Sequence, residues 1–348
     1  MRAKLRKVDR QNPDGEILRE AGLILQRGGL VAFPTETVYG LGGDALNPKA
    51  SQKIYAAKGR PSDNPLIVHI ARMEDLYPLC EEVPEKALTL AKRFWPGPLT
   101  MIFPASEMVP RQTTGGLDTV AVRFPSDKVA QGLILAAGGY VAAPSANTSG
   151  RPSPTTAARV AEDLGDAIDM ILDGGAADIG LESTIVDFSG EEAVILRPGY
   201  ISLDMLRETI GEGRLDTGLI TEDVRPKAPG MKYRHYAPKA DLFVVEGEEK
   251  AVVETISRLV MEKEGQGVRC GILSSAEHAP YYGKGEVLLA GHLSCEEEIA
   301  RGLYENLRLF DERGVSIIYS EAFDTPHMGQ AIMNRLLKAA GHKVIKAF

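Results

Sequence analysis

A stretch without regular periodicity separates two differently patterned parts of the chain. Residues 211–239 contain G-E-G-R-L-D-T-G and K-A-P-G-M-K-Y-R-H-Y-A-P-K, and neither sequence sustains a helical or a strand period. Connections this long are uncommon inside one compact domain, and those that occur are often functional. In a chain of 348 residues we expect a first domain over 1–210, a linker or lid over 211–239, and a second domain over 240–348.

The first region alternates helical and strand patterns. The apolar spacing predicts helices over 12–29, 47–58, 84–94, 126–137 and 155–164, the first of them capped by Asn12. It predicts strands at 30–33, 66–70, 99–103, 119–123, 140–143, 170–173, 183–188 and 193–197. The Ser189-Gly190 turn between the last two strands indicates an antiparallel hairpin, so we expect a mixed-sheet α+β domain and not a doubly wound one.

The second region has the pattern of a small three-layer α/β domain. Strands at D-L-F-V-V, V-R-C-G-I-L-S-S, E-V-L-L-A and V-S-I-I-Y-S alternate with helices near 248–263, 295–313 and 329–340. This alternation predicts a largely parallel, Rossmann-like sheet. The region lacks G-x-G-x-x-G and G-x-x-x-x-G-K-[ST], so no motif supports a nucleotide site there.

Composition narrows the class of protein. A net charge of -8 argues against a broad basic surface that coats nucleic acid, although a local basic pocket remains compatible with it. Cys80, Cys270 and Cys295 show no C-x-x-C spacing, so we expect neither a disulfide framework nor a structural zinc site, and a cytoplasmic location. The N-terminal charges precede no apolar segment, and no run of about 18 apolar residues occurs, so we expect no membrane association.

The segment K-G-R-P-S-D-N-P, 58–65, concentrates two cations at the end of a predicted helix. Gly59 can adopt the left-handed conformation that ends a helix, and Pro61 favours extended geometry at Arg60. Lys58 and Arg60 are thereby held near one another. Two interpretations stay open: the cations complement the helix dipole and point to solvent, or they form a phosphate clamp.

A second polar loop, A-P-S-A-N-T-S-G-R-P-S-P at 143–154, follows an apolar strand. It presents Ser145, Asn147, Ser149 and Ser153, and hydroxyl, amide and backbone N–H groups at a strand end suit phosphate oxygens. The same residues are also typical of a plain turn. Read together with the cationic segment, however, this loop favours an anion site.

Three further features carry polar groups near predicted strands. P-T-E-T-V-Y-G-L-G, 34–42, adds two threonine hydroxyls and a carboxylate, or is simply a capped turn. His69 and Arg123 each alternate with apolar residues along a strand, which places them either on a solvent face or in a site. No Ser-His-Asp order, H-E-x-x-H motif or paired-carboxylate signature stands out, so we expect chemistry by positioning and charge neutralisation.

The predicted linker is basic and aromatic. Residues 225–239 carry five cations without an acid, together with Tyr233, His235 and Tyr236. A solvated basic linker is one interpretation. Docking of the linker onto an anionic ligand is the other.

The motifs resemble the threonylcarbamoyl-AMP synthase family, in its long two-domain form. The resemblance rests on P-T-E-T-V-Y-G-L-G, K-G-R-P-S-D-N-P-L-I-V-H-I, W-P-G-P-L-T, G-L-D-T-V-A-V-R-F-P, A-P-S-A-N-T-S-G-R-P-S-P, L-E-S-T-I-V-D, L-R-P-G, A-P-G-M-K-Y-R-H-Y-A-P and A-I-M-N-R-L-L-K-A-A. It implies a twisted, YrdC-like catalytic domain with a positive concave face, and a Rossmann-like C-terminal domain. It covers nearly the whole chain.

The resemblance also implies a reaction. L-threonine, bicarbonate and ATP, the last with Mg²⁺, would give threonylcarbamoyl-AMP and pyrophosphate, without an organic cofactor. The product would feed threonylcarbamoyl-adenosine formation next to the tRNA anticodon through downstream transfer proteins, with no stable nucleic-acid complex required. A carbamate is labile in water, so we expect 211–239 to close over the site.

Site residues follow from the motif positions. The resemblance assigns ATP contacts to Lys58, Arg60, Asn64, Thr119, Ser145, Asn147, Ser153, Arg197, Tyr233 and His235, with Lys58 and Arg60 as the catalytic cations. It assigns threonine contacts to Thr37, His69, Arg123, the backbone at Ala143, and Ser183. Arg123 would hold the substrate carboxylate, and His69 the substrate hydroxyl. It assigns no metal ligand.

Two alternatives stay open. A double-stranded RNA-binding module could use a concave basic face, although the acidic net charge counts against it. A carbamoyl transferase of hydrogenase maturation would share the N-terminal fold, but such proteins carry zinc-binding cysteine clusters and an acylphosphatase segment that this chain lacks.

Overall fold

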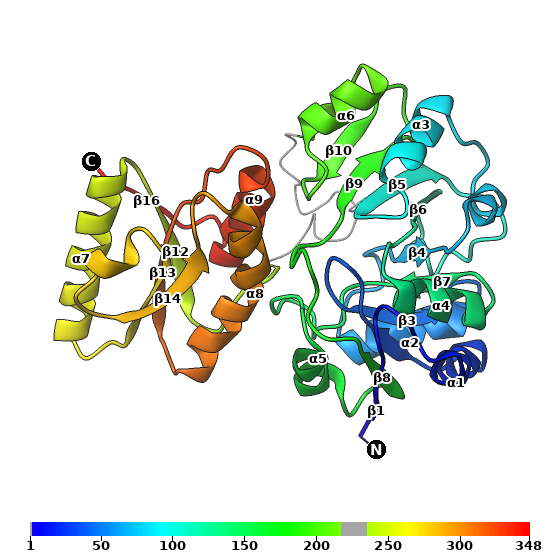
Figure 1. Ribbon diagram of the computed structural model, residues 1–348, viewed down its shortest axis with the longest axis horizontal. Coiled ribbons are helices and arrows are strands. Elements are labelled where there is room, and N and C mark those ends of the chain that lie inside the picture. Colours follow the sequence, from blue (N-terminus) through cyan, green and yellow to red (C-terminus); the bar gives the residue numbers. More distant parts are fainter. Residues whose placement is uncertain (1, 217–234) are drawn as a thin grey trace. The chain divides into compact units, whose positions relative to one another are not determined.

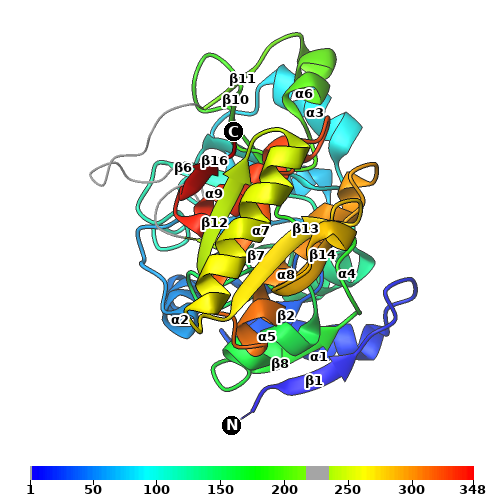
Figure 2. The same ribbon diagram turned by 90° about the vertical axis from the view of Figure 1, so that its left-hand side faces the viewer.

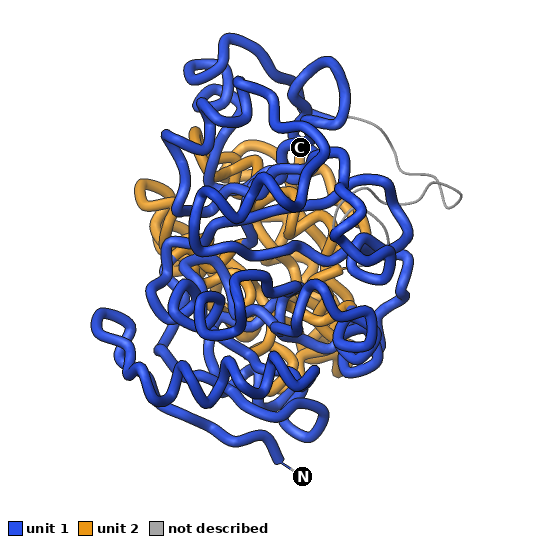
Figure 3. The backbone as a smooth tube through the Cα atoms, turned by 90° about the vertical axis from the view of Figure 1, so that its right-hand side faces the viewer, with its two compact units in different colours: residues 1–149, 153–178, 182–233 blue, residues 150–152, 179–181, 234–348 orange. Residues whose placement is uncertain are grey.

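The computed structural model describes residues 2–216 and 235–348, which fall into two compact units (Figure 3). Unit 1 holds Met1–Ser149, Ser153–Asp178 and Glu182–Tyr233, and unit 2 holds Gly150–Pro152, Ile179–Leu181 and Arg234–Phe348. Most of the predicted linker lies outside the described residues, and with it the proposed closure over the site.

Unit 1 is built on a mixed sheet of eleven strands, counted over the described residues. In spatial order the strands are β1 (Lys4–Lys7), β8 (Met170–Asp173), β2 (Val31–Phe33), β3 (Gly40–Asp44), β7 (Val141–Ala143), β4 (Ile67–His69), β6 (Thr119–Arg123), β5 (Leu99–Pro104), β9 (Thr184–Asp187), β10 (Val194–Arg197) and β11 (Arg214–Leu215). β4 and β6 are parallel, whereas β9 and β10 form the predicted antiparallel hairpin. The expected mixed sheet is confirmed.

Helices cover both faces of this sheet. They are α1 (Gly15–Gln26), α2 (Pro48–Lys58), α3 (Glu85–Phe94), α4 (Lys128–Ala137), α5 (Ala157–Leu164), α6 (Leu203–Ile210) and a 3-10 turn, η1 (Met73–Leu79). α1 and α4 pack with Val31 and Phe33 in one core, whereas Ala32 belongs to the larger core on the opposite face. α3 and α6 lie side by side over that larger core (Figures 1 and 2).

Helix ends follow the expected chemistry with one correction. Asp14, and not Asn12, caps α1, because its carboxylate accepts a hydrogen bond from the Glu16 backbone N–H. Gly59 ends α2 in the left-handed conformation at φ 60°, as the sequence predicted. The cationic segment is therefore fixed by the backbone geometry of a helix end.

Unit 2 has the predicted three layers. Within 235–348 its sheet has five strands, all parallel, in the order β14 (Glu286–Gly291), β13 (Cys270–Ser275), β15 (Ile317–Glu321), β12 (Asp241–Glu246) and β16 (Val344–Lys346). α7 (Glu249–Gly265) covers one face, while α8 (Glu296–Glu312) and α9 (Gly329–Ala340) cover the other (Figures 1 and 2). A 3-10 turn, η2 (Ala279–Tyr281), lies between β13 and β14.

Two short segments that interrupt the sequence of unit 1 are built into unit 2. Arg308 of α8, which is 1% exposed, donates from Nη2 to the Pro152 carbonyl at 2.6 Å, and the Ala237 N–H donates to the Gly150 carbonyl at 2.9 Å. Gly180 has φ 83°, and a Cβ there would lie 2.5 Å from Arg301 Cα. Only glycine fits this position.

No membrane-crossing helix occurs within 2–216 and 235–348, because each helix there is too short or too polar.

Candidate active site

His69 and Arg123 are neighbours on one face of the unit 1 sheet. β4 and β6 run parallel with His69 opposite Arg123, and both side chains lie on the face opposite Val68 and Val122, which belong to the larger core. His69 is 3% exposed and Arg123 is 4% exposed. The solvent-face interpretation is therefore wrong for both residues, and two polar groups are buried side by side.

The imidazole of His69 is held in its neutral form. Burial, reinforced by the positive charge of Arg123, lowers the pKa of His69 from 6.5 to about 3. Its Nδ1 lies 3.1 Å from the Ile67 carbonyl, and its ring meets that of Phe33 edge to face at 6.1 Å between centroids. A neutral imidazole in a fixed orientation suits a hydrogen bond to an uncharged hydroxyl.

Arg123 meets a buried carboxylate. Its Nη2 lies 2.8 Å from Glu36 Oε1, and both side chains are more than nine-tenths buried. The geometry of this contact is nevertheless poor for hydrogen bonding. Among the described residues, Nε and Nη2 of Arg123 donate no hydrogen bond of acceptable geometry, and neither carboxylate oxygen of Glu36 accepts one. The contact is thus an ion pair by distance, with unused hydrogen-bonding capacity on both partners.

A chain of polar contacts continues from Arg123 across the next strands. Thr100 of β5 is paired with Arg123, and its hydroxyl lies 2.8 Å from the Ser183 hydroxyl. Arg197 donates from Nε to the Ser183 carbonyl at 3.0 Å and from Nη2 to the Ser183 hydroxyl at 3.2 Å. Predicted threonine and ATP residues are therefore linked directly.

Lys58 binds the second predicted loop. Its ammonium donates to the carbonyls of Ser145 and Asn147, each at 2.5 Å, and lies 3.3 Å from Asn147 Oδ1. In the other direction, the Ser149 N–H donates a hydrogen bond to the Lys58 carbonyl at 2.9 Å. Because Lys58 is only 2% exposed, the interpretation in which it points to solvent is wrong. The two loops form one structure around a buried cation.

Other predicted residues occupy separate positions. Arg60 donates from Nη2 to the carbonyls of Asn64 and Pro65 at 3.2 and 3.0 Å, and so braces its own loop. Asn64 is buried, and its Oδ1 accepts no hydrogen bond from the described residues. The Ser153 hydroxyl donates to buried Glu182 at 2.5 Å.

The remaining predicted residues are divided between the two units. Thr37 is buried, with its hydroxyl 2.9 Å from that of Thr35, and Ala143 ends β7. Thr119 begins β6, at the opposite end of that strand from Arg123. Tyr233 lies outside the described residues, and His235 belongs to unit 2, where its ring is beside Tyr236.

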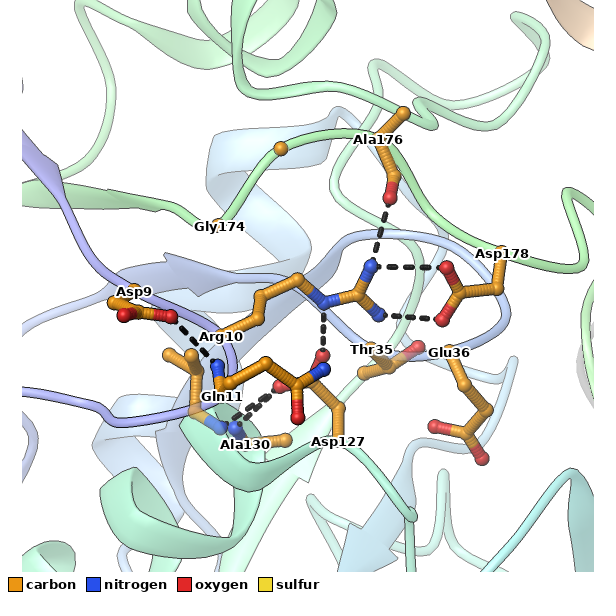
Figure 4. A network of polar contacts seen from close by, with 12 residues as sticks. Asp9, Arg10, Gln11, Thr35, Glu36, Asp127, Ala130, Gly174, Ala176 and Asp178 are labelled. Atoms are coloured by element: carbon orange, nitrogen blue, oxygen red, sulfur yellow. Dashed lines mark hydrogen bonds and ion pairs between the residues drawn. The ribbon is translucent and has the colours of Figure 1, made fainter.

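Loops at the site are braced from a distance. Arg10 donates from Nε to Asp127 at 2.7 Å and through both terminal nitrogens to Asp178 (Figure 4). Tyr39 donates to the Gly175 carbonyl at 2.7 Å. Burial alone would lower the pKa of Arg10. The negative charges and hydrogen bonds of Asp127 and Asp178 have the larger combined effect, so the pKa is raised above its usual value. The loop after β8 is therefore fixed at both ends.

The sequence prediction assigned no role to Glu36, Thr100 or Glu182. All three occur within the motifs P-T-E-T, W-P-G-P-L-T and L-E-S-T, so the signal was position inside a motif. Conversely, five of the predicted residues follow one line across the sheet. Ala143, His69, Arg123, Ser183 and Arg197 lie on or directly beside β7, β4, β6, β9 and β10, with only β5 interposed.

Comparison with known proteins assigns the family. A family model described as "Telomere recombination" matches residues 23–199, and one described as "Threonylcarbamoyl-AMP synthase, C-terminal domain" matches 201–341. Threonylcarbamoyl-AMP synthases of Pyrococcus abyssi and Bacillus subtilis are 49% and 48% identical over 330 residues, covering 94% of this chain and 95% and 94% of the relatives. The crystal structure titled "P. abyssi Sua5 complexed with L-threonine" matches with TM-score 0.93 and 47% identity, covering 99% of each chain.

The fold and these matches together define a two-domain α/β enzyme. The chain belongs to the threonylcarbamoyl-AMP synthase family. Membership favours the synthase over the RNA-binding module and the carbamoyl transferase that the sequence left open.

Proposed function

We propose that this enzyme makes L-threonylcarbamoyl-AMP from L-threonine, bicarbonate and ATP, with release of pyrophosphate. The observation that carries the proposal is the line of polar residues across adjacent strands, from the Lys58 loop contacts at β7 to Arg197 on β10. A relative of 47% identity that was crystallised with L-threonine supports threonine as the amino acid.

Different parts of this line suit different substrates. Arg123 offers a guanidinium fork to a carboxylate, and neutral His69 offers a hydrogen bond to a hydroxyl. Lys58 supplies a desolvated positive charge beside the backbone of Ser145 and Asn147, a setting that strengthens its interaction with phosphate oxygens. Threonine would occupy the part of the line around His69 and Arg123, and the triphosphate the part around Lys58.

The chemistry would proceed without a covalent enzyme intermediate. The threonine amine adds to bicarbonate, and an oxygen of the resulting carbamate attacks the α-phosphorus as pyrophosphate leaves. Negative charge gathers on the α-phosphate and on the leaving group, so Lys58 and Arg60 stabilise the transition state electrostatically. We propose magnesium as part of the ATP substrate. The described residues contain no group of three or more His, Cys, Asp or Glu placed to hold a metal.

The product would be passed to separate proteins that modify tRNA next to the anticodon. An acyl adenylate carries a good leaving group, which makes it a donor for transfer. This step concerns proteins other than this chain.

Pyrophosphate release tests the proposal. With MgATP, omission of either threonine or bicarbonate should abolish release. Serine should support release more slowly, since one methyl group contributes about 1–3 kcal/mol to discrimination. Valine, which lacks the hydroxyl, should be poorer still. Equal release with and without threonine would contradict the proposed reaction, and equal rates for threonine and valine would remove the role of His69.

A further inference from the structure

Glu36 is a buried carboxylate with no assigned role in the reaction. It lies in the loop between β2 and β3, is 6% exposed, and has Arg123 as its ion-pair partner at 2.8 Å. Figure 4 shows it near Arg10, but the contacts drawn from Arg10 go to Asp127, Ala176 and Asp178. Arg10 is thus committed elsewhere, and Arg123 is the cation that Glu36 meets.

The pair is incomplete as a structural ion pair. A desolvated carboxylate is costly unless hydrogen bonds compensate, and a buried ion pair is stabilising only when its geometry is good. Here neither Glu36 oxygen accepts a hydrogen bond of acceptable geometry from the described residues, and Nε and Nη2 of Arg123 donate none. By contrast, buried Glu182 accepts from Ser153, and buried Asp127 accepts from Arg10. Polar groups left unsatisfied in a buried site call for an explanation, and a ligand that satisfies them is one.

An α-amino acid has the complementary chemistry. Its carboxylate can take the donors of Arg123, and its ammonium can take the acceptors of Glu36, so one zwitterion satisfies both groups. A charge-assisted contact on each side also fixes the orientation of the amino acid. The bound amino acid then has its amine directed at the Glu36 carboxylate, which can act as a base.

We propose that Glu36 binds the α-ammonium of the substrate amino acid and accepts its first proton. This inference rests on the function proposed above. Glu36 takes one proton from the ammonium, which frees the nitrogen lone pair. The nitrogen then forms a bond to the bicarbonate carbon, a carbon–oxygen bond breaks, and that oxygen leaves as water with a second nitrogen proton. The products are a carbamate, water and protonated Glu36, with no change in oxidation state.

Binding of two ligands to two proteins tests the first half of the proposal. Titration calorimetry compares L-threonine with (R)-3-hydroxybutyrate, which is threonine without its amino group, on the full chain and on its Glu36→Gln variant. Glutamine keeps the size of the side chain but removes its charge. Threonine should bind the variant roughly 10- to 100-fold more weakly, whereas 3-hydroxybutyrate should bind it at least as well as it binds the unchanged protein.

The alternatives give different patterns. Equal weakening of both ligands would mean that Glu36 only supports the fold, and tighter binding of both would mean that it only competes for Arg123; either result overturns the proposal. Unchanged threonine binding overturns it as well. Failure of the unchanged protein to bind threonine at all would instead overturn the proposed function. Asp187→Asn, which removes a buried carboxylate next to Ser189, serves as control and should alter neither ligand.

The pH dependence tests the second half. The Glu36→Gln variant has no proton acceptor at this position, so it can use only threonine whose amine is already deprotonated in solution. Its threonine-dependent pyrophosphate release should then rise about tenfold per pH unit below the pKa of the amine. The unchanged protein should show a flatter profile, and Glu36→Asp should restore part of that flatness. Parallel profiles for the unchanged protein and Glu36→Gln would remove the proton-accepting role.

Discussion

The Lys58 amine is buried where almost no water reaches it. Burial lowers its pKa well below the usual lysine value, and the neighbouring charge of Arg60 lowers it further. Carbonyl oxygens of Ser145 and Asn147 compensate the ammonium in part. A phosphate bound beside Lys58 would add a negative charge and favour the protonated form of the amine.

Replacing Lys58 should therefore affect two properties. Lys58→Met should reduce threonine-dependent pyrophosphate release by at least roughly 100-fold, the usual scale for losing one electrostatic group aimed at a developing charge. It should also lower the free energy of unfolding by about 2 kcal/mol, because two carbonyls lose a donor. Lys49→Met, on the exposed face of the same helix, is the control. Retained activity in Lys58→Met would show that Lys58 has a purely structural role.

His69 gives stability a defined pH dependence. Its pKa is about 3 in the folded chain and 6.5 when exposed, so the unfolded chain binds a proton that the folded chain does not. The contribution is complete above pH 6.5 and is lost as pH falls toward 3. Between pH 7.5 and 5 this group alone should remove about 2 kcal/mol of stability.

Denaturant unfolding at the two pH values measures this effect. His69→Gln should show a decline smaller by that amount. His292→Gln should leave the decline in place, because His292 is exposed and its pKa is raised by Glu298. An identical decline in His69→Gln and the unchanged protein would contradict the predicted pKa.

At the scale of elements, one arginine connects three segments that are distant in sequence. Arg10 follows β1, Asp127 caps α4, and Asp178 follows β8. Arg10→Ala should cost about 3 kcal/mol in the free energy of unfolding, because it leaves the buried Asp127 charge without its partner. Arg111→Ala also breaks an Arg–Asp pair, but an exposed one with Asp118, and should cost less than about 1 kcal/mol. Similar losses in both variants would argue against a bracing role.

β3 depends on glycine for a different reason. A Cβ on Gly42 would lie 3.0 Å from Phe33 Cε1 and 3.0 Å from Val141 Cγ1. Gly42→Ala should destabilise the chain by about 1–3 kcal/mol through overpacking. Gly190→Ala, where no heavy atom lies within 4 Å, should change stability by less than about 0.5 kcal/mol. Urea unfolding of both variants tests the difference. An unchanged free energy of unfolding in Gly42→Ala would show that Phe33 and Val141 can shift to make room for the added methyl group.

These same features show what the sequence could and could not predict. Eight of the nine α-helices in the described residues, most strands and both polar loops followed from periodicity, helix ends and motifs, whereas α6, β1, β11 and β16 were not predicted. β3 was not predicted, because G-L-G-G-D looks like a turn until its close neighbours are known. Alternation placed His69 and Arg123 on one face of their strands, but burial of that face depends on chain segments far away. Glu36 carried no local signal for its pairing with Arg123, 87 positions later in the sequence.

At the scale of the whole molecule, unit 2 includes more than the C-terminal part of the sequence. Gly150–Pro152 and Ile179–Leu181 belong to it, and they directly precede Ser153 and Glu182, which are bonded to each other. The two units are therefore not interchangeable modules joined end to end. A change in unit 2 can reach site residues along the backbone.

Arg308 tests this connection. Arg308→Met should lower the free energy of unfolding by about 2 kcal/mol, since the Pro152 carbonyl loses a charged donor. It should also reduce pyrophosphate release, because the segment before Ser153 is less firmly held. Arg313→Met, which breaks a partly exposed pair with Glu286, is the control and should cost less than about 1 kcal/mol. Full activity in Arg308→Met would show that Ser153 is positioned without this contact.

The bond between Pro152 and Arg308 also sets an order of events during synthesis. The two residues are 156 positions apart, so Pro152 leaves the ribosome long before its partner exists. At roughly 5–20 residues per second the wait is on the order of 8 to 30 s. The backbone segments before Ser153 and Glu182 can reach their final contacts only after α8 has been synthesised. A nascent chain thus exposes the unfinished segments before Ser153 and Glu182 for most of the time it takes to translate the second half.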